Sequence, residues 1–182
     1  VQGEWRDMLR GTAAHTALSV DCRNACEIRP DGHIGRRPHR VEAVRTDQDD
    51  AALIEGCHDG YVPISGLLHR RRLYLGNRGQ DLRGEDSLEC VCGLSRCVDV
   101  TARFHLHPSV AASLTGDGED VLLRLPGGSG WRFQQSGASV SLDTSVYIGD
   151  GGTLRKTRQI VLTAPMEADR LRIKWALRKE EA

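Results

Sequence analysis

Hydrophobic and polar residues alternate with a period of two along most of this chain. The clearest case spans residues 170–177, where every second side chain is apolar and most of the residues between are charged. The apolar positions are Leu171, Ile173, Trp175 and Leu177. Alternation of this kind is typical of a β-strand with one face in a hydrophobic core and the other in water. We therefore expect a half-buried strand here.

The same pattern recurs in further segments separated by turns. Strands are predicted at residues 12–20, 40–46, 51–57, 67–75, 82–92, 98–107, 110–114, 121–125, 131–135, 139–148, 157–163 and 170–177. Stretches rich in Gly, Asp and Pro lie between them, as at residues 77–79 and 149–152, and residues 24–40 form one longer loop. Short alternating strands with turns every ~8–12 residues predict an all-β fold, an antiparallel β-sandwich of about twelve strands.

Neither a substantial helix nor a second domain is expected. Residues 4–10 could form one helical turn, but Gly3 and Gly11 bracket them and so short a helix is unstable alone. The 182 residues fit a single β-sandwich domain. No apolar run approaches the ~18 residues of a membrane span, and the N-terminus lacks the features of an export signal. The missing initial methionine predicts that this domain belongs to a longer polypeptide.

Charge and cysteine content narrow the possible partners. Basic and acidic residues number 25 each and neither gathers in a tail, which argues against nucleic acid as a partner. Six cysteines are present, at positions 22, 26, 57, 90, 92 and 97. Their spacing lacks the C-x2-C pairs of structural zinc sites, so we interpret them as small buried or half-buried thiols.

The predicted strand at residues 67–75 carries the densest charge in the chain. Alternation places His69 and Arg71 on one face and the two other arginines on the opposite face. Both faces mix apolar and cationic groups, which is costly unless the cations meet acidic partners on the next strand. The predicted ion-pair network comprises His69, Arg70, Arg71, Arg72, Glu85 and Asp86. Direct binding of an anion by the arginines is the alternative.

Three other places could line a binding groove. His15 falls on the polar face of the predicted strand at residues 12–20, among small neighbours that leave its imidazole room to reach a ligand. His58 and Tyr61, in the sequence HDGY, lie where a strand enters a turn. The polar face of the strand at residues 98–107 carries Arg103, His105 and His107. The alternative for each is a solvated side chain or a plain turn.

A set of motifs in a fixed order resembles a known family. The motifs are AAHTALSVD, HDGY, LLHRRRLYL, LRGED, RFHLHPSV, GWRF, SVYIG, RQIVLT and KWALR. From about Trp5 to Arg178 the chain is similar to the C-terminal β-sandwich region of the heparinase II/III-like polysaccharide lyases. The resemblance implies an N-terminal α/α toroid domain in the same longer protein, absent from this chain, with the substrate groove between toroid and sandwich.

The resemblance also implies a reaction, the β-elimination of an acidic, uronic-acid-containing polysaccharide. Such cleavage needs the sugar carboxylate neutralised, a base for the C5 proton and an acid for the leaving O4. In the family the toroid supplies a tyrosine and an Asn or His, and a histidine from the start of the sandwich, matched by His15, completes the groove. Tyr61, Arg103, His105 and His107 are then candidate substrate-binding residues. This chain alone should be inactive; the alternative is a non-catalytic carbohydrate-binding or structural module.

Some members of the family hold a structural zinc ion with two histidines and an aspartate. His58 resembles one of these ligands, but Ala17 stands where zinc-binding members have a histidine. His33 or Asp31 in the long loop could compensate. We therefore expect no cofactor, with zinc at His58 as the alternative, and the sequence leaves a periplasmic or a cytoplasmic location open.

Overall fold

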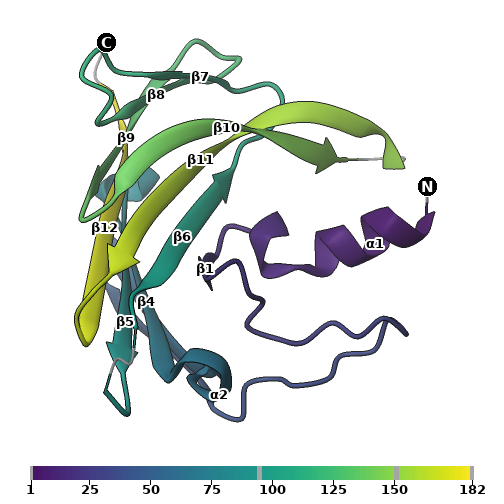
Figure 1. The fold of residues 1–182 in the computed structure, drawn as a ribbon. Helices are drawn as coiled ribbons and strands as arrows, with labels where there is room; N and C mark the ends of the chain where they lie inside the picture. The colour runs from purple at the N-terminus through teal and green to yellow at the C-terminus, as the bar shows by residue number, and fades with distance from the viewer. Residues whose placement is uncertain (1, 94–95, 150–151, 181–182) are drawn as a thin grey trace.

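The computed structural model describes residues 2–93, 96–149 and 152–180 and contains the predicted antiparallel β-sandwich (Figure 1). The larger sheet has the order β2-β3-β4-β5-β12-β9-β8-β7 and the smaller sheet the order β1-β6-β11-β10. The larger sheet comprises β2 (Val41–Gln48), β3 (Ala51–Tyr61), β4 (Leu67–Gly76), β5 (Asp81–Cys90), β7 (Ala111–Leu114), β8 (Val121–Arg124), β9 (Gly130–Ser136) and β12 (Arg170–Lys179). The smaller sheet comprises β1 (Leu18–Val20), β6 (Val98–His105), β10 (Ser139–Ile148) and β11 (Leu154–Met166).

The hydrophobic core lies between the two sheets. Strand β12 enters it as predicted, because Ile173 is 0% exposed and Trp175 is 7% exposed. The Trp175 indole packs against Phe104 of β6, with ring centroids 4.8 Å apart, and stacks on Phe133 of β9 at 6.1 Å. Alternation along this strand therefore gave the correct inward face.

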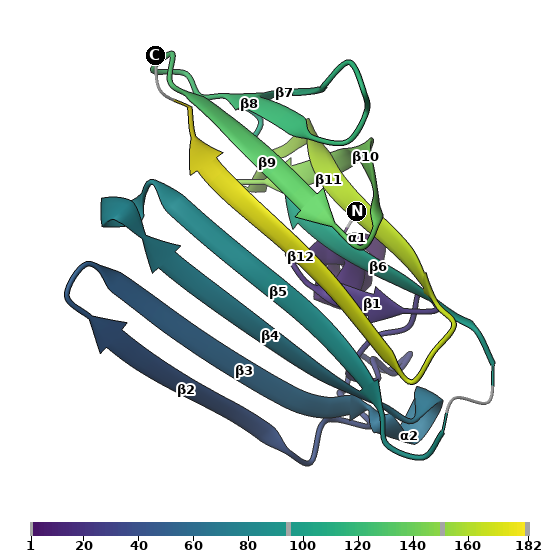
Figure 2. The ribbon, with the colours of Figure 1, turned by 90° about the vertical axis from the view of Figure 1, so that its left-hand side faces the viewer.

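The larger sheet extends beyond the smaller one at its β2 end. Figure 2 shows the outer face of this sheet, with β2 and β3 at one edge and the smaller sheet behind the opposite part. Every residue of β2 is exposed, and Val41 and Val44 are 70% and 61% exposed. The inner face of β2 to β4 is therefore free to form one wall of a pocket with other segments.

The N-terminal segment differs most from the sequence-based prediction. In place of one helical turn there is a nine-residue helix, α1 (Gln2–Arg10), whose Arg10 Nη1 donates a hydrogen bond to the carbonyl of Gly32 at 2.5 Å. The predicted strand at residues 12–20 is a 3-10 turn, η1 (Thr12–Ala14), followed by the three-residue β1. Figure 1 shows α1 on the side of the smaller sheet that faces away from the larger one.

Two shorter helical segments and one bulge complete the chain. They are α2 (Val62–Ser65) and the 3-10 turn η2 (Asn77–Gly79), the latter at a predicted turn. The HDGY sequence does not enter a turn; it ends β3 with a bulge between His58 and Tyr61, and α2 follows. The turn predicted at residues 149–152 lies partly outside the described residues.

The cysteines are more exposed than predicted, and none of the six is paired in a disulfide. Cys57 is buried and Cys26 and Cys90 are half-buried, whereas Cys22, Cys92 and Cys97 are exposed. Among the helices of the described residues, none is long and apolar enough to cross a membrane.

Candidate functional site

A pocket of about 460 Å³ lies where the uncovered end of the larger sheet meets the N-terminal segment. We call it the His15 pocket. It is lined by Arg10, Thr12, His15, Ala17, Leu18, Asn24, Ala25, Cys26, Val41, Glu42, Ala43, Gly56, Cys57, His58, His69 and Arg71. The fold therefore gathers three histidines and two arginines from three separate stretches of sequence.

His15 reaches this pocket from an irregular segment, so the prediction that a strand carries it was wrong. It follows η1, with extended backbone angles of φ −122° and ψ 163°. Its N–H donates to the carbonyl of Thr12 at 3.2 Å, and its carbonyl accepts from the N–H of Ala17 at 2.8 Å. The residue is exposed, and among the described residues its imidazole has no hydrogen-bond partner. Both ring nitrogens are thus free for a ligand.

His58 and His69 form a hydrogen-bonded chain that ends at Asp86. The Nδ1 of His58 accepts from the N–H of Gly60 at 3.2 Å, and its Nε2 lies 3.1 Å from Nδ1 of His69. Burial is the main cause that lowers the pKa of His58 to about 4. His58 is therefore neutral at pH 7, and the hydrogen-bond pattern assigns its proton to Nε2. That proton faces Nδ1 of His69, whose own proton lies on Nε2 and is donated to Oδ1 of Asp86 at 2.8 Å.

Asp86 is the centre of the buried polar network. It is 1% exposed, and Arg71 binds it with two parallel hydrogen bonds, Nε to Oδ1 at 2.7 Å and Nη2 to Oδ2 at 2.9 Å. The indole Nε1 of Trp175 donates to Oδ2 at 3.2 Å. Burial alone would raise the pKa of Asp86, but the hydrogen bond from His69 and the charge of Arg71 outweigh it and lower the pKa to about 2.

A glycine makes room for this arrangement. Gly84 lies opposite Trp175 in the β5–β12 ladder, and a Cβ atom added there would lie 2.1 Å from the indole ring. Any side chain at position 84 would displace the indole and remove its hydrogen bond to Asp86. Alternation predicted Trp175 only as a core residue, so this polar contact was missed.

The remaining members of the predicted network lie on the outer face of the larger sheet and have other partners. Arg72 Nε binds Glu55 at 2.6 Å, and Glu85 lies 3.4 Å from Arg172 instead of pairing with β4. Arg70 is exposed, next to Glu42. The two faces of the strand therefore differ. His69 and Arg71 point inward and bond to Asp86, whereas the other two arginines point outward and lie near acidic residues on the surface.

Tyr61 does not line a groove, contrary to the prediction. It is 0% exposed, and its hydroxyl donates to the carbonyl of Leu18 at 2.7 Å. Burial raises the pKa of Tyr61 to about 12, so the hydroxyl stays protonated as a donor. A substrate cannot reach a side chain with no exposed surface, and its role is therefore internal.

Arg103, His105 and His107 lie outside the lining of the His15 pocket. His105 uses both ring nitrogens internally, with Nδ1 2.8 Å from the Ser145 hydroxyl and Nε2 3.0 Å from the Ala13 carbonyl. Burial is the main cause that lowers the pKa of His105. Arg103 donates to the Ser19 hydroxyl at 3.2 Å, whereas His107 is exposed and bonded to Ser109 at 2.6 Å. Of the three, only His107 is exposed, whereas Arg103 and His105 are half-buried.

The residues around His58 do not fit a zinc site. Both of its nitrogens take part in the hydrogen bonds described above, and the nearest imidazole, that of His69, directs Nε2 to Asp86. Ala17 also lines the pocket and offers no ligand atom, and Asp31 and His33 pair with each other in the exposed loop. Within the described ranges no group of three or more His, Cys, Asp or Glu side chains could hold a metal ion.

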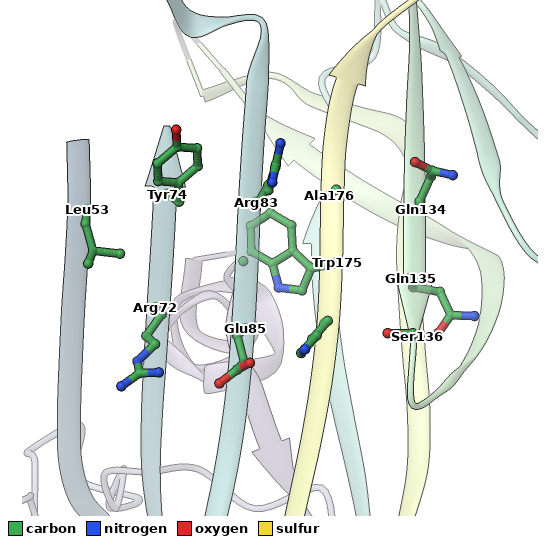
Figure 3. Close-up of a pocket in the computed structure, with 12 residues that line it drawn as sticks. Leu53, Arg72, Tyr74, Arg83, Glu85, Gln134, Gln135, Ser136, Trp175 and Ala176 are labelled. Carbon is green, nitrogen blue, oxygen red and sulfur yellow. The ribbon is translucent and has the colours of Figure 1, made fainter. Parts of the chain in front are cut away.

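A second cavity, of about 470 Å³, lies on the outer face of the larger sheet (Figure 3). We call it the outer hollow. Figure 3 shows Tyr74 and Arg83 on neighbouring strands at its rim. The Arg83 guanidinium lies 5.6 Å from the Tyr74 ring centroid and binds Asp81 at 2.6 Å, and Arg72 is held by Glu55. Both arginines are thus paired with neighbouring carboxylates, and the lining of the outer hollow contains no histidine.

Several pocket residues were not identified from the sequence, because they carry no recognisable motif. Thr12 and Asn24 are examples. The Thr12 N–H donates to Oδ1 of Asn24 at 2.7 Å, and the Thr12 hydroxyl accepts from the N–H of Ala25 at 3.1 Å. These bonds close the pocket between η1 and the long loop, and no local pattern reveals a pairing across that distance.

Comparison with known proteins agrees with the fold. A curated relative, FtsZ-localized protein C of Caulobacter vibrioides (strain NA1000 / CB15N), is 37% identical over 150 residues, which cover 78% of this chain and 26% of the relative. The solved structure of heparan sulfate lyase HepC from Pedobacter heparinus matches with a TM-score of 0.77 at 12% identity, over 98% of this chain and 26% of that one. A heparinase III structure matches with a TM-score of 0.72 at 13% identity, over 99% and 26%.

These matches show two different things. The solved structures, at such low identity, show the shared β-sandwich fold alone, and the chain spans about a quarter of the length of each protein compared. Membership follows from sequence. The sequence model described as "Heparinase II/III-like, C-terminal" matches residues 1–176. The chain therefore belongs to the heparinase II/III-like C-terminal family, as its motifs had indicated.

Proposed function

We propose that this chain is the sandwich part of a polysaccharide lyase that cleaves an acidic, uronic-acid-containing chain by β-elimination. The observation that carries the proposal is the state of His15. Its backbone is hydrogen-bonded on both sides, whereas its imidazole is free in a pocket of about 460 Å³. A fixed base with an unoccupied ring is what proton transfer to or from a bound sugar requires.

Three other polar side chains of the pocket are already committed to internal hydrogen bonds, which supports a site that is completed from elsewhere. Arg71 already donates hydrogen bonds to Asp86 and to the carbonyl of Thr16, and its charge is paired with Asp86. It is therefore poorly placed to neutralise a sugar carboxylate. His58 and His69 bond to each other. We propose that the carboxylate-neutralising group and the second proton-transfer group come from another part of the protein, an N-terminal toroid domain facing this pocket.

The test is His15→Ala in the full-length protein. We expect turnover of uronate polysaccharide, followed by the absorbance of the unsaturated product, to fall at least ~100-fold, the size typical of an acid–base group. The matched control is His33→Ala, because the His33 side chain is 80% exposed in the long loop. Residues 1–182 alone should give no product at all. Near-normal turnover by a folded His15→Ala protein would contradict the proposed role.

A second candidate function is a non-catalytic binding or structural module. The observation that favours it is the 37% identical relative, which is named for its localisation with FtsZ and not for an activity. A fluorescent fusion of the full-length protein in dividing cells tests it. Recruitment to the FtsZ ring that survives His15→Ala, with no turnover by the wild-type protein, would favour this function over the lyase.

A further inference from the structure

The backbone on both sides of His15 is held by side chains that reach in from distant strands. We call residues 13–18 the His15 segment. Three of its carbonyl oxygens accept side-chain hydrogen bonds: Ala13 from His105 Nε2 at 3.0 Å, Thr16 from Arg71 Nη1 at 2.7 Å, and Leu18 from the Tyr61 hydroxyl at 2.7 Å. The donors come from β6, β4 and β3, so both sheets contribute to the placement of one short segment.

Each of the three donors is itself fixed. Tyr61 is 0% exposed and lies in the core. Arg71 is held by two hydrogen bonds to the buried Asp86. His105 is held by the Ser145 hydroxyl, which lies 2.8 Å from its Nδ1. Because a carbonyl oxygen can only accept, the Nε2 of His105 carries the proton that it donates to Ala13.

The segment has little regular structure to hold it otherwise. Its first two residues end the short 3-10 turn, and only Leu18 belongs to β1. The Ala17 carbonyl accepts from the N–H of Arg103 at 3.0 Å, which extends the ladder by one bond. Without the side-chain donors, the stretch between the turn and the strand would have few bonds to either sheet. The His15 imidazole, in contrast, is left free.

We infer that Tyr61, Arg71 and His105 are positioning residues, which fix His15 in the pocket by binding the carbonyls of the His15 segment, and that Asp86 acts through Arg71. This inference rests on the proposed function for its catalytic meaning. Its structural content, that the three donors order the His15 imidazole, can be measured without any activity.

The first measurement is the imidazole NMR spectrum of the full-length protein labelled with ¹⁵N-histidine, with the His15 signal assigned by its loss in His15→Ala. Tyr61→Phe keeps the buried ring and removes the hydroxyl, which donates to Leu18 and also bonds to the Thr12 side chain. We expect the His15 signal to shift or to split into several. The control Tyr74→Phe also removes one hydroxyl, from the outer face of the sheet, and should leave the His15 signal unchanged.

The second measurement uses a pair of variants at His105. His105→Leu removes the donor to Ala13, whereas His105→Gln keeps an amide N–H that can take its place. We expect the His15 signal to change in His105→Leu and to return towards the wild-type position in His105→Gln. A purely space-filling role for His105 would not distinguish the two variants in this way. The pair also serves if Tyr61→Phe does not fold.

The third measurement is turnover. A misplaced catalytic group lowers the chemical step more than binding, so Tyr61→Phe should lower kcat by ~10–100-fold with KM changed less than ~3-fold. An unchanged His15 signal in both Tyr61→Phe and His105→Leu, in folded proteins, would overturn the inference. If the His15 signal moves as expected but the wild-type protein turns over no uronate polysaccharide, the positioning role stands and the lyase proposal fails.

Discussion

The two faces of β4 carry the same residue type in very different surroundings. Arg71 points inward, its side chain 20% exposed, to a carboxylate that is 0% exposed. Arg72 points outward, its side chain 51% exposed, to Glu55 at 35%. The two ion pairs are almost equally short, 2.7 Å and 2.6 Å. Distance therefore says little about what each pair contributes, and burial decides it.

The inner pair also does something that the outer pair does not. Asp86 accepts from His69, Arg71 and Trp175 at once, and Arg71 passes a further hydrogen bond on to Thr16. The inner face thus connects the core to the segment that carries His15. On the outer face, ion pairs such as Arg72 with Glu55 form on the surface of the sheet and connect to no functional segment. Substitutions on the two faces should therefore differ in how much they destabilise the protein.

Arg71→Met should give the largest loss of stability. It leaves the buried Asp86 carboxylate without its main cationic partner, and removal of one partner of a buried pair costs about 3–5 kcal/mol. Urea unfolding of the variant and of the wild-type protein measures the difference. A loss of unfolding free energy below ~1 kcal/mol would show that the pair of Arg71 and Asp86 contributes no more than an exposed surface ion pair.

Acidification should act through the same network. Because burial lowers the pKa of His58 from 6.5 to about 4, the unfolded chain binds a proton before folded His58 does. Stability should therefore fall as the pH drops from about 6.5 to 4. Asp86 follows, since its pKa is lowered from 3.8 to about 2, and the stability that it contributes is present above pH 3.8 and is lost as the pH falls through 2.

At ~1.4 kcal/mol per pKa unit the Asp86 step is worth about 2.5 kcal/mol, and the His58 step at most about 3.5 kcal/mol, less because the half-buried imidazole is partly screened by solvent. Unfolding free energies measured in urea at a series of pH values would show them. Asp86→Asn should remove the lower step and keep the upper one. A stability that is flat between pH 7 and 4 would contradict the assignment of His58 as neutral and buried.

Arg72→Met should have the smallest effect, although it makes the same substitution one residue along the strand. An exposed pair such as Arg72 with Glu55 contributes about 0–1 kcal/mol, and salt screens it further. The same urea experiment applies, at low and at high salt. A loss equal to that of Arg71→Met would remove the distinction between the two faces.

Alternation along the sequence correctly predicted which side chains face inward where that depends only on the strand that carries them. The inward face of β12 and the division of β4 into two faces follow from period two alone. The motifs placed His15 in a pocket for a different reason, through family resemblance. The partners of Glu85 and Arg72 could not be predicted, because the choice between Arg172 and a β4 arginine depends on rotamers across an exposed sheet.

The misassigned residues share one cause, which is distance along the chain. Only Leu18–Val20 of the strand predicted at residues 12–20 form β1, and the carbonyls of Ala13 and Thr16 bond to the side chains of His105 and Arg71 instead of to a neighbouring strand. The burial of Tyr61 could not be predicted, because its partner Leu18 lies 43 positions earlier and the local sequence does not reveal their contact. The nine-residue helix α1 gains from Gly32 a contact that its own sequence does not contain. Such pairings exist only in three dimensions.

The anchoring of the His15 segment also sets an order of assembly during synthesis. Its residues leave the ribosome before the strands that hold it, and His105 and the β6 residues that pair with β1, such as Ala102, emerge about 90 residues later. Contacts this far apart in sequence are slow to form, because a long loop must close before any of them is made. The start of the domain is therefore translated early and completed late, and a chain arrested before β6 would hold the His15 segment with only the donors from β3 and β4.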